Sequence, residues 1–351
     1  DKVSLPLDVR DDFRVSWGDR SGGIACLDQK AFEDTRGVAK EIVQEIGKKI
    51  LSGQLSLHQI SISIRCMMAK TSLQVVAGSC AMMPFYLRKA AQSSSSVERM
   101  KLVICMWFSV LHHIVAFRKP LNGMLGETYH AELPDGTQVF LEQVSYHPQV
   151  VAMNVQGAEK LFTFVAAIAW EPHAGLNTIR LKTCGIREVA FADGHVISFT
   201  SPTDQITGTF FGSQLKFEAQ GKVHFEDSDG NSCDLVIGGA YRRHSDYFEG
   251  TLKGPNLEQM CKVTGTYLGY IDFDAKRYWD IRHVLPLAAT AVLSHVLPSD
   301  SRHRHDRELH EAGNRLQEAQ KSKEAYEAQM AADRKLRQSG RARCRDGKVQ
   351  A

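Results

Sequence analysis

Hydrogen-bond donors that suit an anion gather in the middle of the chain, at Lys119, Asn122, Tyr146 and His147. Their ammonium, amide, phenol and imidazole groups all donate to phosphate oxygens. Pro148 restricts His147 to an extended backbone and so fixes the direction of the imidazole. Gly123 and Gly126 have no side chain, so the backbone there can come close to a bound anion. The group predicts an anion-binding site, and the alternative is that these residues only cap strands and helices.

Catalysis has weaker support in the sequence. Glu142, Tyr146 and His147 could form an acid–base set, but no nucleophile or nucleotide-binding motif accompanies them. The eight cysteines are scattered without C-x-x-C spacing, which is typical of a reducing compartment and predicts neither a zinc site nor a disulfide framework. We therefore predict a protein that is not an enzyme and that uses no metal or cofactor.

The bulk composition narrows the class of protein. A hydrophobic fraction of 43% with 24% charged residues over 351 residues is typical of a globular chain, and the net charge of +3 favours no class of partner. No apolar run reaches the roughly 20 residues that a membrane-spanning helix needs, and no signal peptide opens the chain. We expect a cytoplasmic protein. The start at Asp1 suggests a fragment whose flanking domains lie outside this sequence.

Strands are predicted from about Thr137 to Asp274. Segments rich in Val, Ile, Phe and Thr alternate with turns that contain Gly, Asp or Pro. Because helices do not interrupt them, they favour a large antiparallel barrel or sandwich. Nine or more such strands leave an interior that side chains alone do not fill, which predicts a ligand cavity.

Helical periodicity flanks this region. An amphipathic helix is predicted over 38–51, and it either docks on the core or acts as a mobile lid. Its apolar stripe consists of Val38, Ile42, Val43, Ile46, Ile50 and Leu51. A short strand over 60–64 and helices over 66–93 and 96–117 follow, the last of them apolar nearly all round and therefore buried. Two C-terminal helices are predicted over 282–296 and 308–337.

Three ordered motifs resemble the oxysterol-binding-protein-related lipid-transfer proteins. K-P-L-N-G-M-L-G-E-T (119–128) is similar to K-P-x-N-P-x-L-G-E, and E-Q-V-S-Y-H-P (142–148) to that family's E-Q-V-S-H-H-P-P fingerprint. L-P-S-D-S-R-H-R-H-D-R (297–307) is similar to its L-P-x-x-D-S-R-x-R-x-D motif. The resemblance covers about residues 36–337, between an N-terminal tail or loop (1–35) and a basic tail (338–351).

The resemblance implies an α+β fold. It consists of an incomplete antiparallel barrel (about 118–274) around a lipid tunnel, a lid helix (38–51), and flanking helices (66–117 and 282–337). It also implies an inositol-phosphate site at the tunnel mouth, with Lys119, Leu121, Asn122, Tyr146, His147, Lys323, Glu327 and Arg334. Two departures from the family pattern bear on the headgroup: Tyr146 stands where the first histidine is expected, and Ala331 where an arginine is expected. Gln149 in place of the second fingerprint proline is a smaller change. Since a hydrogen bond from a cation is stronger than one from a neutral donor, headgroup affinity should fall about tenfold.

The function that the resemblance implies is lipid binding and transfer at membrane contact sites. A sterol or phospholipid is carried in the lidded tunnel, in exchange with phosphatidylinositol 4-phosphate. The alternative is a phosphoinositide-dependent tether or sensor that moves no lipid. Expected partners are the lipid and, transiently, anionic membranes. We expect a monomer that binds no nucleic acid.

Overall fold

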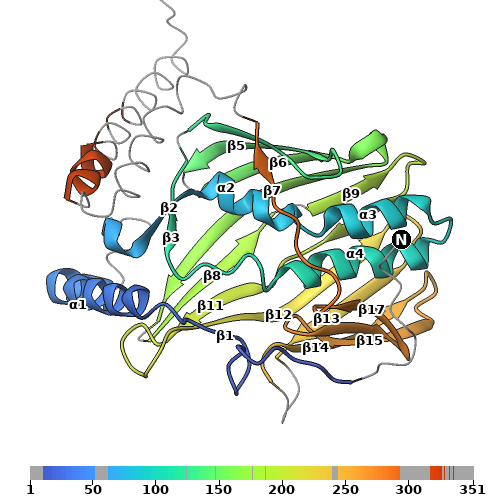
Figure 1. Ribbon diagram of the computed structural model, residues 1–351, viewed down its shortest axis with the longest axis horizontal. Helices are drawn as coiled ribbons and strands as arrows, with labels where there is room; N and C mark the ends of the chain where they lie inside the picture. The colour runs from blue at the N-terminus through green and yellow to red at the C-terminus, as the bar shows by residue number, and fades with distance from the viewer. Residues whose placement is uncertain are drawn as a thin grey trace, which may run out of the picture.

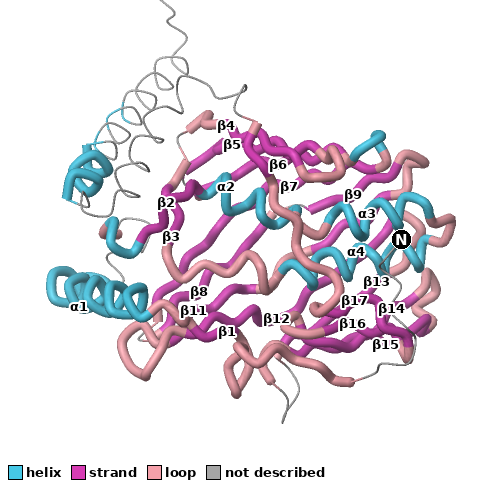
Figure 2. The backbone as a smooth tube through the Cα atoms, viewed as in Figure 1, coloured by secondary structure: helices cyan, strands magenta, loops and turns pink. Residues whose placement is uncertain are grey.

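The computed structural model describes residues 11–51, 62–123, 125–146, 148–175, 177–185, 187–238, 244–292, 317–325, 328, 332 and 335. Of residues 43–51, 146 and 174 it describes the backbone alone. Most of these residues belong to one curved sheet, with helices laid across it (Figures 1 and 2).

Sixteen of the described strands form this sheet, and they pair antiparallel throughout. The order is β17-β16-β15-β14-β13-β12-β10-β9-β7-β6-β5-β4-β18, with β8 and β11 between β7 and β12, and β1 also on β12. The strands are β1 (Ile24–Ala25), β4 (Thr128–Glu132), β5 (Gln138–Tyr146), β6 (Gln149–Gln156), β7 (Phe162–Ala174), β8 (Thr178–Cys184), β9 (Arg187–Phe191), β10 (Val196–Phe199), β11 (Thr203–Thr207), β12 (Lys216–Asp227), β13 (Ser232–Ile237), β14 (Tyr247–Lys253), β15 (Gln259–Thr266), β16 (Tyr270–Phe273), β17 (Lys276–Asp280) and β18 (Thr290–Ala291). The predicted antiparallel barrel is confirmed, and it is incomplete because the path ends at β17 and β18 rather than closing.

Helices occupy the inner face of the sheet. They are α2 (Ser72–Ala77), α3 (Met83–Gln92) and α4 (Ser96–Val110), with a 3-10 turn, η3 (Gly78–Cys80), between the first two. In Figure 1 they run across the strands, with β5 to β7 on one side and β12 to β17 on the other. The ring of Phe108 lies 4.3 Å from that of Phe248, and Trp107 lies 5.2 Å from Phe199. The all-round apolar character of α4 is thus explained by its burial among inward-facing strand residues.

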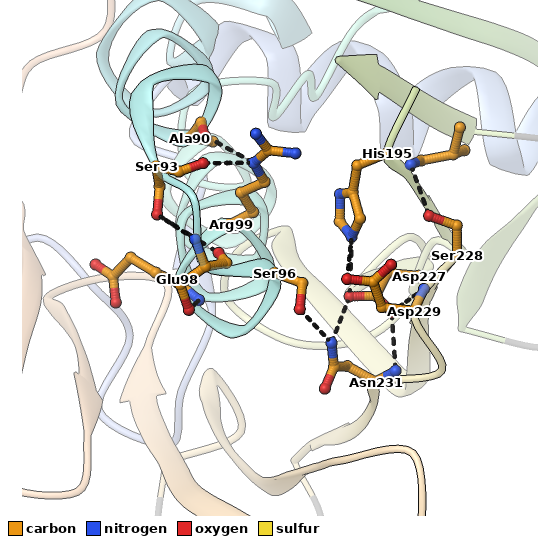
Figure 3. A network of polar contacts seen from close by, with 12 residues as sticks. Ala90, Ser93, Ser96, Glu98, Arg99, His195, Asp227, Ser228, Asp229 and Asn231 are labelled. Atoms are coloured by element: carbon orange, nitrogen blue, oxygen red, sulfur yellow. Dashed lines mark hydrogen bonds and ion pairs between the residues drawn. The ribbon is translucent and has the colours of Figure 1, made fainter. Parts of the chain in front are cut away.

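Buried Arg99 fixes the first turn of α4 in place. Its Nε donates to the carbonyl oxygens of Ala90 (3.1 Å) and Ser93 (2.9 Å) at the end of α3 (Figure 3). Its two Nη atoms donate to the carboxylate of Asp193, at 2.9 and 2.6 Å. A planar guanidinium suits this arrangement because it presents its donors in a fixed fork.

The β12–β13 turn holds the same end of α4 from the other side. Asn231 donates to the hydroxyl of Ser96 (3.0 Å) and to Asp227 (2.8 Å), and His195 lies 3.3 Å from Asp227. Figure 3 shows these side chains converging on the helix from the sheet. The network ties the helix to the barrel wall, so it is structural.

Residues 281–292 cross the open side of the barrel without forming a helix, beginning with a turn at 281–283. Ile281 N donates to Gly269 O beside β17, Leu287 N donates to Ala81 O among the helices, and β18 pairs with β4. The helix predicted over 282–296 is therefore wrong for 282–292, while 293–296 lie outside the described residues. Pro286 explains the difference, since proline disfavours a helical residue before it and lacks the N–H that a helix needs.

The N-terminal segment is more ordered than the predicted tail or loop. It contains β1 and the first part of α1 (Gln29–Leu51), so the helix begins nine residues before the predicted start at 38. Asp28 caps α1, its carboxylate accepting from Ala31 N at 2.9 Å. Buried Phe32 packs with Leu215 of the barrel. The early turns of α1 are thereby fixed to the wall.

The region predicted as one helix over 66–93 is broken. It holds the 3-10 turn η2 (Ile64–Cys66), strand β2 (Met67–Thr71), α2, η3 and α3. Thr71 ends the strand and starts α2 with a capping box, in which its hydroxyl accepts from Gln74 N. The strand predicted over 60–64 is wrong over 62–64, because 62 and 63 belong to no strand and Ile64 belongs to η2; residues 60 and 61 lie outside the described part of the chain.

Candidate functional site

Strand β3 (Lys119–Leu121) presents the first motif at one end of the barrel. It pairs in parallel with β2, Met67 lying opposite Lys119 and Thr71 opposite Leu121. Pro120 is tolerated because this sheet has only two strands. Leu121 is 3% exposed and packs in a small apolar cluster with Ile64, Met67 and Ala319. The cluster fixes the position of the strand that carries Lys119.

Lys119 and Asn122 lie together, as the motif predicts. The Lys119 ammonium donates to the Asn122 side-chain oxygen at 2.5 Å and to Pro120 O at 3.3 Å. Both side chains are half-buried. A cation and an amide held this way at a strand end suit a phosphate group.

A C-terminal helical segment, residues 317–325, brings Lys323 to the same part of the molecule. Ala319 is fully buried against Leu121, and the Gln320 side-chain oxygen accepts from Ile64 N at 2.8 Å. Lys323 follows Ala319 by one helical turn and is 6% exposed, so it lies on the helix face that packs against β2 and β3. The structure thus joins Leu121 of the first motif to the helix of Lys323 across roughly 200 residues of sequence.

The second motif is bonded directly to the first. Gly126 N donates to Gln143 O at 2.8 Å, and Gln143 N donates to Glu127 O at 2.9 Å. Gln143 lies beside an irregularity in the β5–β6 register and is fully buried, its amide donating to Ser145 O (2.6 Å) and Val150 O (3.0 Å). The two motifs therefore form a single structural unit.

Ser72 at the start of α2 completes this unit. Its hydroxyl accepts from Gly123 N (3.3 Å) and from the Gln149 amide (3.4 Å), which also lies 3.4 Å from the Gln143 side-chain oxygen. A Cβ on Gly123 would lie 3.3 Å from Gln143 Cβ, tighter than most real contacts. We call Ser72, Gly123, Glu127, Gln143 and Gln149 the rim cluster. The sequence reading missed the structural roles of Ser72, Gln143 and Gln149 because hydroxyl and amide side chains carry no distinctive spacing.

Gln149 stands where the family fingerprint has its second proline. A proline at this position has no amide to join Ser72 to Gln143. This departure therefore adds hydrogen bonds to the rim cluster.

Several predicted residues lie outside the described part of the chain. His147, Glu327 and Arg334 are among them, and Tyr146 is described only as the backbone of β5, paired with Gln149. Their roles at the headgroup site stay predictions. The tyrosine-for-histidine change is likewise untested.

The predicted lid falls within α1. Val38 is 5% exposed and Ile42 is half-buried, whereas the side chains of Val43, Ile46, Ile50 and Leu51 lie outside the described residues. Glu41 accepts from Arg65 of η2 at 2.7 Å and raises the pKa of that guanidinium. The first half of the helix is thus bound to the barrel end that carries Lys119, and a lid role for its second half stays a prediction.

Comparison with known proteins agrees with this arrangement. The family model "Oxysterol-binding protein" matches residues 45–287. The chain belongs to the oxysterol-binding protein family. It is 28% identical over 341 residues to oxysterol-binding protein 9 of Dictyostelium discoideum, covering 90% of this chain and 79% of that protein. It is 33% identical over 121 residues to oxysterol-binding protein-related protein 1C of Arabidopsis thaliana, covering 33% of this chain and only 14% of the plant protein.

Solved structures share the fold. The Osh3 ORD of Saccharomyces cerevisiae in complex with PI(4)P superposes with a TM-score of 0.67 at 19% identity, covering 94% of this chain and 89% of that one. The Osh1 ORD domain in complex with ergosterol gives a TM-score of 0.71 at 19% identity, covering 81% and 77%. An Osh1 ORD domain in complex with cholesterol also matches.

Two further features are absent from the described residues. Within the described ranges, no helix is both long and apolar enough to span a bilayer. Over the same residues, no group of three or more His, Cys, Asp or Glu side chains could hold a metal ion.

Proposed function

We propose that this protein carries one lipid at a time within the barrel and transfers it between membranes. The sterol and PI(4)P complexes of its structural neighbours support this class of ligand. An apolar lipid would be buried beside the apolar inner face, and burial of about 300 Å² of lipid surface corresponds to roughly 7 kcal/mol. We infer non-enzymatic action by a monomer in the cytoplasm that meets anionic membranes transiently.

The exchanged lipid in this proposal is phosphatidylinositol 4-phosphate. The observation that supports it is the packing of Leu121 on Ala319, which places the strand of Lys119 beside the helix of Lys323. Two ammonium groups and the Asn122 amide at one barrel end suit the charge of an inositol phosphate. His147, Tyr146, Glu327 and Arg334 would complete the site, and the second half of α1 would close over it.

Extraction from liposomes tests both parts of the proposal. Lys119→Ala and Lys323→Ala should each lower extraction of phosphatidylinositol 4-phosphate by roughly tenfold, since each removes a charged hydrogen-bond donor. Sterol extraction should stay within about twofold, because the sterol has no phosphate. Lys182→Ala is the matched control, since Lys182 is exposed on β8 and pairs with Glu171.

The results of these extraction experiments distinguish lipid transfer from a tether or sensor function. Failure to extract any lipid would overturn the transfer proposal. Liposome binding that depends on Lys119 and Lys323 without any lipid movement would favour the tether or sensor. An equal loss of both lipids in the lysine variants would contradict the headgroup assignment.

A further inference from the structure

The outer face of strands β4 to β7 carries a groove of about 430 Å³. The side chains that line it point away from the helices, because the residues between them in each strand belong to the core or pack against it. These outward residues are Thr128, His130, Phe140, Glu142, Ala152, Asn154 and Val165. The groove therefore lies on the opposite side of the barrel wall from the interior in which a lipid would be carried.

A row of paired residues crosses this groove and continues onto β9. His130 of β4 lies opposite Phe140 of β5, which in turn lies opposite Asn154 of β6. Val165 of β7 and Glu188 of β9 continue the row. Because neighbouring strands are about 4.8 Å apart, the five positions span roughly 19 Å.

The floor of the groove is apolar. Phe140 and Val165 are both 37% exposed, and the ring of His130 stacks on that of Phe140 at 4.4 Å. Ala152 and Ala167 lie opposite one another on β6 and β7, and their short side chains leave room beside the two larger residues. Contiguous apolar surface on an exposed sheet face marks an interaction site.

Three glutamates surround the apolar floor on a face that has no cation. Glu142 follows Phe140 by two residues on β5, Glu132 lies at the end of β4, and Glu188 ends the row. The residues of β4, β5, β6 and β7 include no lysine or arginine, and the one arginine of β9, Arg187, is buried on the inner face.

Carboxylates on other strands of the same sheet have cations beside them. Glu171 lies 3.6 Å from Lys182 across β7 and β8, and Asp234 lies 3.0 Å from Lys222 across β13 and β12. Among the described residues, none of the three glutamates around the groove has such an ion pair. The surface is therefore complementary in charge to a basic partner.

The pairing of the strands determines the shape of that partner. β5, β6 and β7 are hydrogen-bonded on both sides, and β18 occupies the outer edge of β4. A strand therefore has no edge to join here, and a sheet face is covered instead by a helix. Three carboxylates disfavour an anionic membrane, and a symmetric contact with a second copy would bring like charges together.

We propose that this groove docks a basic amphipathic helix of a partner protein. Apolar side chains on one face of the helix enter the hollow beside Phe140 and Val165, while lysines or arginines on its flanks reach Glu142 and Glu188. A span of roughly 19 Å corresponds to about 13 helical residues. Since the groove lies outside the barrel, the helix and a carried lipid can bind together, and the inference does not depend on lipid transfer.

A pair of designed peptides tests the apolar floor and the charge around it. Both are fluorescein-labelled helices of about 14 residues with leucines on one face; the other face carries lysines in the first peptide and glutamates in the second. By fluorescence anisotropy, the wild-type protein should bind the lysine peptide about tenfold more tightly or better. Added salt should reduce this preference, because the flanking contacts are exposed to solvent.

Variants locate the binding on this face. Val165→Lys should weaken binding of the lysine peptide by about tenfold or more, because it places a like charge in the apolar floor, and Phe140→Ser should weaken it by about tenfold. Glu188→Gln should weaken it by roughly threefold and reduce its dependence on salt. Val236→Lys is the matched control, since Val236 is 41% exposed on β13 outside the groove and the variant gains the same charge.

Urea unfolding establishes that each variant is folded. Should Val165→Lys fail to fold, the salt dependence of Glu188→Gln decides, because that variant removes only a charge. Equal affinity of the wild-type protein for the two peptides would overturn the proposal. Equal losses in Val165→Lys and Val236→Lys would overturn it as well.

Photo-crosslinking identifies the occupant in cells that express the whole protein. Benzoylphenylalanine in place of Phe140 should cross-link to a segment of another protein that is rich in lysine or arginine. Cross-links to the basic tail of this chain (338–351), to a second copy or to lipid alone would contradict a partner helix. The absence of any cross-linked protein would also contradict it.

Discussion

Two buried arginines at opposite ends of β9 have very different surroundings. Arg99 of α4 lies 4.9 Å over the ring of Phe191, and Arg187 lies over Trp107. Arg99 bonds to two carbonyl oxygens and holds Asp193 with two parallel bonds, whereas Arg187 has one long bond. Both guanidinium groups are buried and lie over an aromatic ring. Only in Arg99 does each of the three guanidinium nitrogens donate a hydrogen bond.

The comparison separates a charge that anchors the fold from one that does not. Where the fold itself provides hydrogen-bond partners, as at Arg99, a charge anchors one element to another. Where the described residues provide only one long hydrogen bond, as at Arg187, the charge holds no elements together.

The largest expected effect is on stability. Arg99→Met should lower the free energy of unfolding by about 2–3 kcal/mol, because it leaves the Ala90 and Ser93 carbonyl oxygens and Asp193 without their donor. Arg187→Met should change it by less than about 1 kcal/mol, since it loses one long bond. Urea unfolding of both variants measures the difference. Similar losses for the two would show that Arg187 is a structural residue.

The carboxylates near these two arginines, Asp193 and Asp204, should respond to pH in opposite directions. Arg99 lowers the pKa of Asp193 to about 2, so ionised Asp193 stabilises the fold above pH 4 and this contribution is lost as the pH falls toward 2. Burial raises the pKa of Asp204 to about 7, so its ionisation opposes folding increasingly as the pH rises from 4 to 7. Asp204 faces Arg187 of β9, with apolar Leu181 and Ala219 on the neighbouring strands.

Asparagine variants measure these two contributions. Asp193→Asn should be less stable than wild type at pH 6, with the gap closing by pH 2. Asp204→Asn should gain stability relative to wild type as the pH rises from 4 to 8. Urea titrations across both ranges provide the comparison, and gaps that do not vary with pH would contradict it.

A smaller effect is expected where α4 begins. The Ser95 hydroxyl accepts from Glu98 N at 3.3 Å and caps the helix. Ser95→Ala should lower the free energy of unfolding by about 1 kcal/mol. Urea unfolding of Ser95→Ala beside wild type measures this loss. An unchanged free energy of unfolding would contradict the capping role of Ser95.

The sequence predicted the barrel well because burial of one strand face produces a period of two over more than 100 residues. It also predicted the burial of α4, since an all-round apolar helix has no face for solvent. The helical filling of the barrel was not predicted, because strand number alone says nothing of what enters the interior. The non-helical path of 282–292 was missed although Pro286 argued against a helix there.

Site residues were predicted unevenly. Lys119, Leu121 and Asn122 belong to a motif, and Lys323 was assigned from the family resemblance. The inward position of Arg187 could not be predicted, because one charge in an alternating strand points inward or outward according to register. Gln149 was noted only as a departure from a proline, yet its amide joins Ser72 to Gln143.

The crossing segment 281–292 has a consequence for synthesis of the chain on the ribosome. β4 is complete once residue 132 has emerged, but its outer edge stays unpaired until Thr290 and Ala291 follow, more than 150 residues later. An unpaired strand edge is a template for pairing with other chains. The nascent protein therefore exposes an aggregation-prone edge while more than 150 further residues are translated, and truncation before residue 290 leaves that edge permanently open.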